Sequence, residues 1–207
     1  MKRYLSLAYK ALRRVWVVLD NKFDNVWCRW VFARENVRHG SFHTCGIPFV
    51  SVARGGECML GDGLRLNNGL KGNPIGRTQP CILFVDGGAR LSIGRNVGLS
   101  STALIAHFSI CIEDDVKLGG GVCVYDTDFH SLDPRIRRDP SADRADRVGK
   151  EVVIGRNAFV GAHSTILKGV RIGADSIVGA CSVVTKDIPP GEIWAGNPAK
   201  FIRRIEG

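Results

Sequence analysis

One short stretch of the chain, residues 124–134 (VYDTDFHSLDP), gathers side chains that could perform acid–base chemistry. His130 stands there close to two carboxyl groups, Asp126 and Asp128. An alcohol attacks an acyl carbon slowly at neutral pH unless a base takes its proton as the bond forms, and histidine suits that task best. We therefore take His130 as the candidate general base. The alternative role is that of a structural histidine at a turn.

A second group should hold the other ring nitrogen of His130, because an acceptor there fixes the tautomer of an imidazole base. Asp128 and Asp126 are near enough in the sequence to do this. A turn-forming aspartate explains Asp128 equally well, and a backbone carbonyl could replace it. Since a long polar loop follows His130 directly, we favour catalysis over a structural role.

A regular repeat surrounds this stretch and must position it. From residue 154 onward an isoleucine or valine recurs every six residues, at Ile154, Val160, Ile166, Ile172, Val178 and Val184. Glycine follows four of the six, and small residues often fill the fifth position. Neither a helix nor an ordinary strand has a period of six. The period predicts a three-sided coil of short parallel strands, with aliphatic side chains inside and glycine where the backbone angles exclude other residues.

The same period appears upstream, with Ile93, Leu99 and Ile105 in one coil and Ile112, Leu118 and Val124 in the next. His107 and Asp126 each follow their aliphatic residue by two positions, so they should stack in adjacent coils about 4.8 Å apart. A substrate-binding pair and a surface hydrogen bond explain this equally well. His163 follows Val160 by three positions and should lie on the outer surface.

Other segments break the period and define the domain organisation. Residues 131–151 carry six basic and five acidic side chains, which predicts a loop projecting from the coil, and a second loop should cover residues 67–80. We expect a helical segment at 1–44, a β-helix at 45–190 and a short tail at 191–207. The fold class is thus an all-β core with an N-terminal helical segment.

The N-terminal segment is strongly basic. The formal net charge is +9, and nine Lys or Arg face three Asp or Glu within residues 1–40. Apolar residues recur at spacings of three and four, at Leu5, Ala8, Leu12 and Val15, followed by Trp16, Trp27 and Trp30. Such a helix could contact an anionic membrane through residues 1–35. We favour a helix that packs on the coil end and buries the tryptophans.

The seven cysteines form no C-x-x-C pair, and their number is odd. This pattern argues against a disulfide framework and against a zinc knuckle. Most of the cysteines should be small buried side chains in a reducing compartment. The N-terminus has no apolar run that is typical of a signal peptide.

Three motifs carry a family resemblance: the array from VVIGRNAFVGAHSTILKGV to DIPPG, the stretch DTDFHSLDP, and AGNPAKFIRRI near the end. Together they resemble the hexapeptide-repeat acyltransferases, most of all the maltose and galactoside type of sugar O-acetyltransferase and the capsule or lipopolysaccharide modifiers. The resemblance implies a left-handed parallel β-helix, a homotrimer, and acetyl-CoA bound in a groove between neighbouring coils.

The resemblance also implies roles for individual residues. His130 matches the position of the catalytic histidine of the family. Six residues match positions that touch the cofactor, and the cations among them suit its phosphates: Ala162, Ala180, Thr185, Lys186, Lys200 and Arg203. Ser100, Ser101 and Thr102 replace an asparagine that helps to bind the sugar in galactoside-type enzymes. Ser100, Thr102 and His107 are our candidate substrate contacts.

The sequence therefore predicts an acetyl-CoA-dependent O-acetyltransferase that acts on a sugar hydroxyl in the cytoplasm or at the inner membrane face. An amino-sugar, an amino acid or an antibiotic is the alternative acceptor. We expect no metal, because a hydratase of this fold needs closely spaced histidines and His107, His130 and His163 lie far apart. A non-catalytic β-helix would leave His130 and the charged loop unexplained. We expect no nucleic-acid partner.

Overall fold

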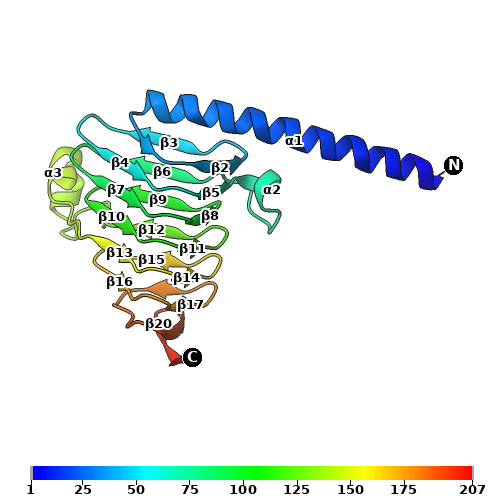
Figure 1. Ribbon diagram of the computed structural model, residues 1–207. Coiled ribbons are helices and arrows are strands. Elements are labelled where there is room, and N and C mark those ends of the chain that lie inside the picture. Colours follow the sequence, from blue (N-terminus) through cyan, green and yellow to red (C-terminus); the bar gives the residue numbers. More distant parts are fainter. Residues whose placement is uncertain (1, 207) are drawn as a thin grey trace.

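The computed structural model describes the backbone of residues 2–206 and the side chains of residues 6–7 and 9–206. The chain runs through three sheets in turn and forms a left-handed parallel β-helix (Figure 1). Sheet A contains β1 (Arg38–His39), β4 (Glu57–Leu60), β7 (Arg90–Ile93), β10 (Ser109–Ile112), β13 (Val152–Ile154) and β16 (Arg171–Ile172). Sheet B contains β2 (Phe42–Cys45), β5 (Leu64–Asn67), β8 (Gly98–Ser100), β11 (Lys117–Leu118), β14 (Phe159–Val160) and β17 (Ile177–Val178). Sheet C contains β3 (Phe49–Val52), β6 (Ile82–Val85), β9 (Ala103–Ala106), β12 (Cys123–Tyr125), β15 (Thr165–Ile166) and β18 (Val183–Val184).

The six-residue period places its aliphatic side chains in the core, as predicted. All six are exposed by 1% or less: Ile154, Val160, Ile166, Ile172, Val178 and Val184. Equivalent residues of successive coils pair directly, so that Ile112 lies between Ile93 and Ile154 in sheet A. The interior is therefore a set of stacked aliphatic columns, each closed above and below by the next coil.

One upstream position differs from the prediction. Leu104, and not Ile105, pairs with Val124 and is fully buried, whereas Ile105 pairs with Tyr125 and is partly exposed. Leu104 follows Leu99 by five residues and precedes Ile112 by eight. The added length therefore lies at the turn after β9, which carries His107.

The glycines of the repeat are explained by close packing, so the expectation that they supply unusual backbone angles is wrong. A Cβ atom at Gly161 would stand 2.5 Å from the backbone nitrogen of Ala180 in the next coil. The left-handed backbone region is occupied instead by turn residues such as Asn157 (φ 58°) and Asp175 (φ 61°). Asparagine and aspartate tolerate that region better than most side chains.

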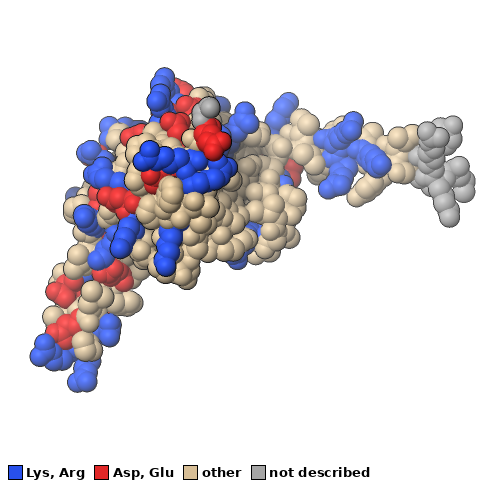
Figure 2. Space-filling model, turned by 90° about the horizontal axis from the view of Figure 1, so that it is seen from below, with Lys and Arg blue, Asp and Glu red and all other residues tan. Residues whose placement is uncertain are grey.

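Two insertions leave the coil at different corners. The first, between β5 and β6, holds the short helix α2 (Gly69–Gly72). The second, between β12 and β13, holds η1 (Ile136–Arg138) and α3 (Pro140–Ala145), and Figure 2 shows its acidic and basic side chains interleaved along a projecting arm. We call this second insertion, residues 127–149, the excursion. Both insertions overlap the segments predicted as loops, 67–80 and 131–151.

The C-terminal segment is more ordered than the tail we expected. β19 (Glu192–Gly196) pairs in parallel with β17, and β20 (Ala199–Arg204) pairs antiparallel with β19. The resulting hairpin covers the last coil at sheet B (Figure 1).

The helix α1 (Lys2–Arg34) covers the opposite end of the coil with its last third. The amide of Asn25 accepts the N–H of Thr44 (3.1 Å) and donates to its carbonyl oxygen (3.0 Å), as a further strand would. The carboxylate of Asp24 accepts the N–H of Gly46 (2.7 Å), and Cys28 and Phe32 are fully buried. The first strands, β1 and all of β2 except Cys45, lie within residues 1–44, the segment expected to be helical.

The expectation that the tryptophans pack on the coil is wrong. Trp16, Trp27 and Trp30 are 72%, 43% and 53% exposed, and much of α1 projects beyond the coil (Figure 1). The side chains of Leu5 and Ala8 lie outside the described residues. Among the described residues, no helix combines the length and the hydropathy that a transmembrane span requires.

Candidate active site

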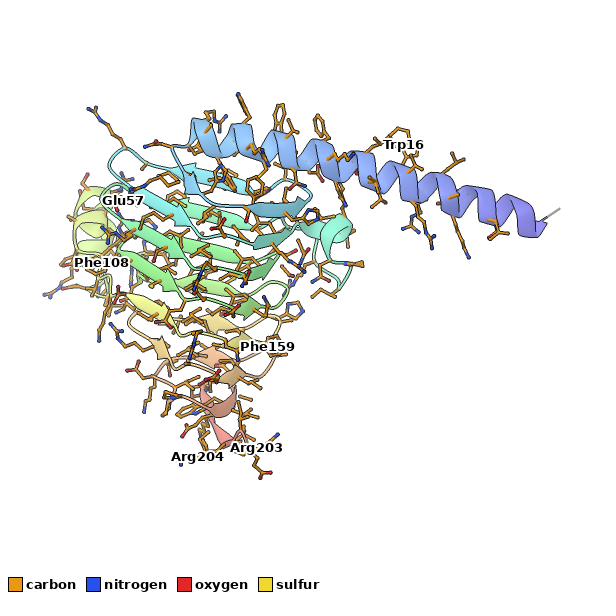
Figure 3. The ribbon with its side chains drawn as sticks, in the orientation of Figure 1. Trp16, Glu57, Phe108, Phe159, Arg203 and Arg204 are labelled. Atoms are coloured by element: carbon orange, nitrogen blue, oxygen red, sulfur yellow. The ribbon has the colours of Figure 1, made fainter. Side chains whose placement is uncertain are left out.

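Apart from Lys200 and Arg203, the site residues predicted from the sequence fall at two corners of the prism that share sheet C. We call the turns that follow β6, β9, β12, β15 and β18 the CA corner, and the turns that precede β9, β12, β15 and β18 the BC corner. The excursion leaves the CA corner, and Phe108 marks this corner in Figure 3.

The CA corner is built on a buried carboxylate that follows β12. Asp126 is fully buried and accepts the backbone N–H groups of His107 (2.9 Å) and Phe108 (2.7 Å) from the coil before it. Burial raises the pKa of Asp126 above its ordinary value, although these two hydrogen bonds act in the opposite direction. Asp126 therefore joins two coils. The predicted stacking of His107 on Asp126 is off by one residue, because Leu104 pairs with Val124, and Asp126 contacts only the backbone of His107.

Phe129 turns the chain outward just before His130. Its φ of 65° lies in the left-handed region, where a bulky side chain is rarely found. The ring of Phe129 packs edge-on against Tyr125 (5.2 Å between centroids) and against His107 (5.7 Å). This packing holds the strained turn in place, and His130 follows it with a side chain that is 65% exposed.

The imidazole of His130 is held by a residue that the sequence did not single out. Its Nδ1 lies 2.7 Å from Oδ2 of Asp143 on α3, and the carboxylate of Asp143 also accepts the N–H of Ser131 at 2.6 Å. The hydrogen bond from His130 and then that from Ser131 lower the pKa of Asp143. Among the described residues, no side chain is hydrogen-bonded to Nε2 of His130.

A second carboxylate of the excursion fixes the same turn. Asp146 accepts the hydroxyl hydrogen of Ser131 at 2.6 Å, and Arg137 donates to the Ser131 carbonyl oxygen at 2.9 Å. Asp139 caps α3 by accepting the N–H groups of residues 141 and 142, with Pro140 in the first turn. The sequence Asp139-Pro140 was a recognisable helix start. It could have indicated that Asp143 lies on an ordered helix and that Asp146 ends it.

Asp128 does not hold His130, contrary to one of our two expectations. Its carboxylate forms an ion pair with Lys168 of the next coil (2.8 Å). Asp126 is committed to the backbone of the preceding coil. Asp143 therefore contacts the ring nitrogen for which the sequence offered Asp128, Asp126 or a backbone carbonyl as the acceptor.

His107 is enclosed at the same corner, one coil before His130. Its side chain is 15% exposed and lies beside Phe84, at 5.4 Å between ring centroids. Its Nδ1 lies 2.8 Å from Oδ2 of Asp86 and 3.2 Å from the guanidinium of Arg147, which comes from the excursion. The excursion is thus attached to the coil at His107 as well as at Asp126.

The other predicted contacts divide between the corners. Thr185 and Lys186 follow β18 at the CA corner, as His130 follows β12, and both are exposed. Ser100, Thr102, Ala162 and Ala180 lie at the BC corner, across sheet C, where Thr102 is fully buried. Lys200 and Arg203 are exposed on β20, and Arg203 is labelled in Figure 3. Within a single chain, the candidate base and the small residues of the BC corner therefore lie on opposite edges of sheet C.

His163 and the cysteines take no part in the acid–base group. Nδ1 of His163 accepts a hydrogen bond from Arg77 (2.9 Å) at the BC corner, so His163 is paired and not simply exposed. Three cysteines are buried, fewer than predicted, and burial raises the pKa of Cys28 and Cys58 to about 12 and of Cys81 to about 11. Within the described part of the chain, no three His, Cys, Asp or Glu side chains are arranged to hold a metal ion.

The chain is similar to known proteins. Residues 151–186 match the family described as bacterial transferase hexapeptide (six repeats). The galactoside O-acetyltransferase of Escherichia coli (strain K12) is 33% identical over 119 residues, which are 57% of this chain and 56% of that protein. The chain thus spans little more than half the length of this curated relative.

Two solved structures extend the comparison. A galactoside acetyltransferase in complex with coenzyme A is 26% identical, with a TM-score of 0.51 over 70% of this chain and 65% of that chain. A mutant of AntD, an N-acyltransferase from Bacillus cereus, in complex with coenzyme A and dTDP-4-amino-4,6-dideoxyglucose has a TM-score of 0.64 over 83% of this chain and 84% of its own. AntD is 20% identical, so its likeness shows the fold alone. The repeat, the fold and these relatives together confirm that the chain resembles the hexapeptide-repeat acyltransferases.

Proposed function

We propose that this protein transfers the acetyl group of acetyl-CoA to a hydroxyl group of a sugar, with His130 as the general base. The observation that carries the proposal is the pair formed by His130 and Asp143. A carboxylate holds one ring nitrogen, and the other ring nitrogen faces outward from an exposed side chain. The likeness to galactoside O-acetyltransferases supports the choice of acetyl donor and sugar acceptor.

The reaction follows from the tautomer that Asp143 favours. When Nδ1–H donates to the carboxylate, Nε2 has a free lone pair and takes the proton of the acceptor hydroxyl. The hydroxyl oxygen then bonds to the thioester carbon, and the tetrahedral intermediate collapses with cleavage of the carbon–sulfur bond. The leaving thiolate takes the proton back from Nε2. Asp143 stabilises the imidazolium that exists between these steps, as a carboxylate does in a catalytic triad.

Acetyl-CoA enters as a substrate, and the cations near the C-terminus fit its phosphates. Lys186, Lys200 and Arg203 are exposed and accessible to a polyanion. Changing Lys200 and Arg203 together to alanine should raise the KM for acetyl-CoA roughly tenfold and leave the KM for the acceptor nearly unchanged. Unaltered binding of coenzyme A to this double variant at low salt would remove both residues from the proposed cofactor site.

A homotrimer would bring the two corners together. A threefold interface joins different surfaces of neighbouring copies, so the CA corner of one copy can face the BC corner of the next. The candidate base and the candidate positions Ser100, Thr102, Ala162 and Ala180 would then line one groove. Sedimentation of the full chain at micromolar concentration should give the mass of a trimer, and a monomer would contradict a shared site.

The acceptor class is tested by the product. Incubation with acetyl-CoA and a panel of sugars, amino-sugars and glycan precursors of capsule or lipopolysaccharide should release coenzyme A only with a hydroxyl acceptor. The product should lose its acetyl group in mild base, as an ester does. A base-stable amide formed with an amino-sugar would replace O-acetylation by N-acetylation, and coenzyme A release with none of the acceptors would contradict the proposed function.

A further inference from the structure

The side of α1 that faces away from the coil has one continuous apolar stripe. Residues spaced by three or four positions fall on one side of a helix. Eight such residues, all 43–72% exposed, form what we call the α1 stripe: Leu12, Val15, Trp16, Leu19, Phe23, Val26, Trp27 and Trp30. Phe23 stacks on Trp27 and Trp27 contacts Trp30, with ring centroids 6.1 and 5.2 Å apart. From Leu12 to Trp30 the stripe extends about 27 Å at 1.5 Å per residue.

The stripe points away from the coil. Asp24, Cys28 and Phe32 are on the side of α1 that packs on the first coil. At 100° per residue, the stripe is centred roughly on the opposite side of the helix. Trp16 stands on the outer side of α1 in Figure 3. A flat surface could therefore contact the whole stripe without meeting the coil.

The charges around the stripe are almost all basic. Lys22 and Arg29 flank the stripe and are exposed. Lys10, Arg13 and Arg14 are exposed on the coil side of the projecting helix, where Figure 2 shows basic side chains. The two acids of this region, Asp20 and Asp24, both form ion pairs with Lys71, at 2.6 Å for Asp20. The free charge of the helix is therefore positive along its projecting length.

Neither neighbouring subunits nor a stacked copy suits this surface well. A threefold axis parallel to the coil places neighbours beside the chain, and the stripe points along that axis. Two copies stacked stripe to stripe would bring Lys22 and Arg29, which flank the stripe, close to the same cations of the other copy. An anionic bilayer offers an apolar layer for the tryptophans together with negative head groups within about one Debye length.

We propose that α1 lies flat on an anionic membrane surface, with the α1 stripe in the interface and the coil standing away from the bilayer. The inference goes beyond the proposed function, because membrane binding requires neither acetyl-CoA nor an acceptor. Its failure would leave the acetyl transfer untouched, and a failed transfer assay would leave membrane binding untouched.

Co-sedimentation of the full chain with vesicles tests the proposal. Binding to vesicles of phosphatidylcholine and phosphatidylglycerol should be at least tenfold tighter than binding to phosphatidylcholine alone. The triple variant Trp16→Ala, Phe23→Ala, Trp27→Ala should bind at least tenfold more weakly and melt at the same temperature, since these side chains do not pack on the coil. The matched control Phe108→Ala, Phe159→Ala removes two aromatic rings that are 56% and 46% exposed elsewhere, and it should bind like the unchanged chain.

A second variant separates charge from hydrophobic contact. Lys22 and Arg29, which flank the stripe, changed together to glutamine should weaken binding to the anionic vesicles and reduce its dependence on salt. Equal vesicle binding by the triple aromatic variant and the unchanged chain would overturn the proposal. The proposal would also be overturned if the stripe paired two copies and bound no vesicles. That pairing would appear as a concentration-dependent doubling of mass that the triple variant abolishes.

Discussion

His107 and His130 belong to the same corner of the prism, after consecutive strands of sheet C, yet their environments are opposite. His107 is 15% exposed, lies between Phe84 and Phe129, and has Asp86 and Arg147 at one ring nitrogen. His130 is 65% exposed and has Asp143 at one ring nitrogen. Both histidines are held by a carboxylate through Nδ1, so the carboxylate alone does not distinguish their roles.

Access distinguishes them. A general base must reach the hydroxyl group of a substrate and later return the proton to the leaving group. The ring of His130 is open to solvent on the side away from Asp143, whereas the ring of His107 is surrounded by aromatic and charged side chains. His107 therefore attaches the excursion to the coil, whereas His130 belongs to the excursion and is held there by Asp143 of α3.

The largest expected effect is the loss of turnover on removal of the exposed ring. His130→Ala should lower kcat by roughly 10²–10⁴ and leave the fold and the affinity for acetyl-CoA nearly unchanged. Steady-state kinetics and thermal melting measure both properties. The matched control is His43→Ala, an exposed histidine on the first coil, which should keep its turnover. Retained turnover in the folded His130→Ala protein would show that the exposed ring has no catalytic role.

The next effect concerns the partner of His130. Asp143→Asn should lower kcat roughly 10- to 100-fold, because an amide neither stabilises the imidazolium nor fixes the same tautomer. The comparison variant Asp128→Asn, whose carboxylate pairs with Lys168, should change kcat less than about threefold. If the two variants lose turnover equally, Asp143 has no special part in positioning His130.

The enclosed histidine should affect stability more than chemistry. His107→Ala removes a packed ring and the imidazole at Asp86, which keeps only a longer ion pair with Arg147 (3.7 Å). The free energy of unfolding should therefore fall by about 1–3 kcal/mol. Turnover per folded molecule should fall less than in His130→Ala. Urea unfolding and kinetics at matched folded concentration measure the two quantities. A large loss of turnover with unchanged stability would reverse the roles assigned to the two rings.

The smallest effect is one of pH. The pKa of Asp143 is lower in the folded chain than in the unfolded chain, so its contribution to stability is present at neutral pH and is lost as pH falls through the folded pKa. Limited proteolysis should therefore cut the excursion faster below about pH 4, near the ordinary pKa of aspartate. Asp143→Asn should be cut at a rate that depends less on pH. An identical pH dependence in both proteins would assign the effect to other carboxylates.

The coil could be predicted from the sequence because each turn repeats the same local rule. One aliphatic residue every six positions and glycine at the crowded contact between coils fix strands that pair with their neighbours. The rule weakens where two apolar residues adjoin. Leu104 and Ile105 could each have lined the interior, and the choice depended on the length of the turn that carries His107.

The candidate base was predictable and its partner was not. His130 interrupts the period and precedes a polar segment, which is visible in the sequence. Asp143 is 13 residues further along, in a segment without hydrophobic periodicity, and it meets His130 only because η1 and α3 fold back on the turn. Which face of α1 packs on the coil could likewise not be predicted from the sequence, because both long faces carry apolar residues. The structure shows which of the two is covered.

Chemical rescue of His130→Ala tests the role of the exposed ring most directly. Loss of the imidazole leaves the carboxylate of Asp143 at an open surface, where free imidazole can bind and accept the proton of the acceptor hydroxyl. Turnover of His130→Ala should rise with added imidazole, while the unchanged chain and His43→Ala should not respond. Near-normal turnover of the folded His130→Ala protein without imidazole would contradict the role of His130 as the general base.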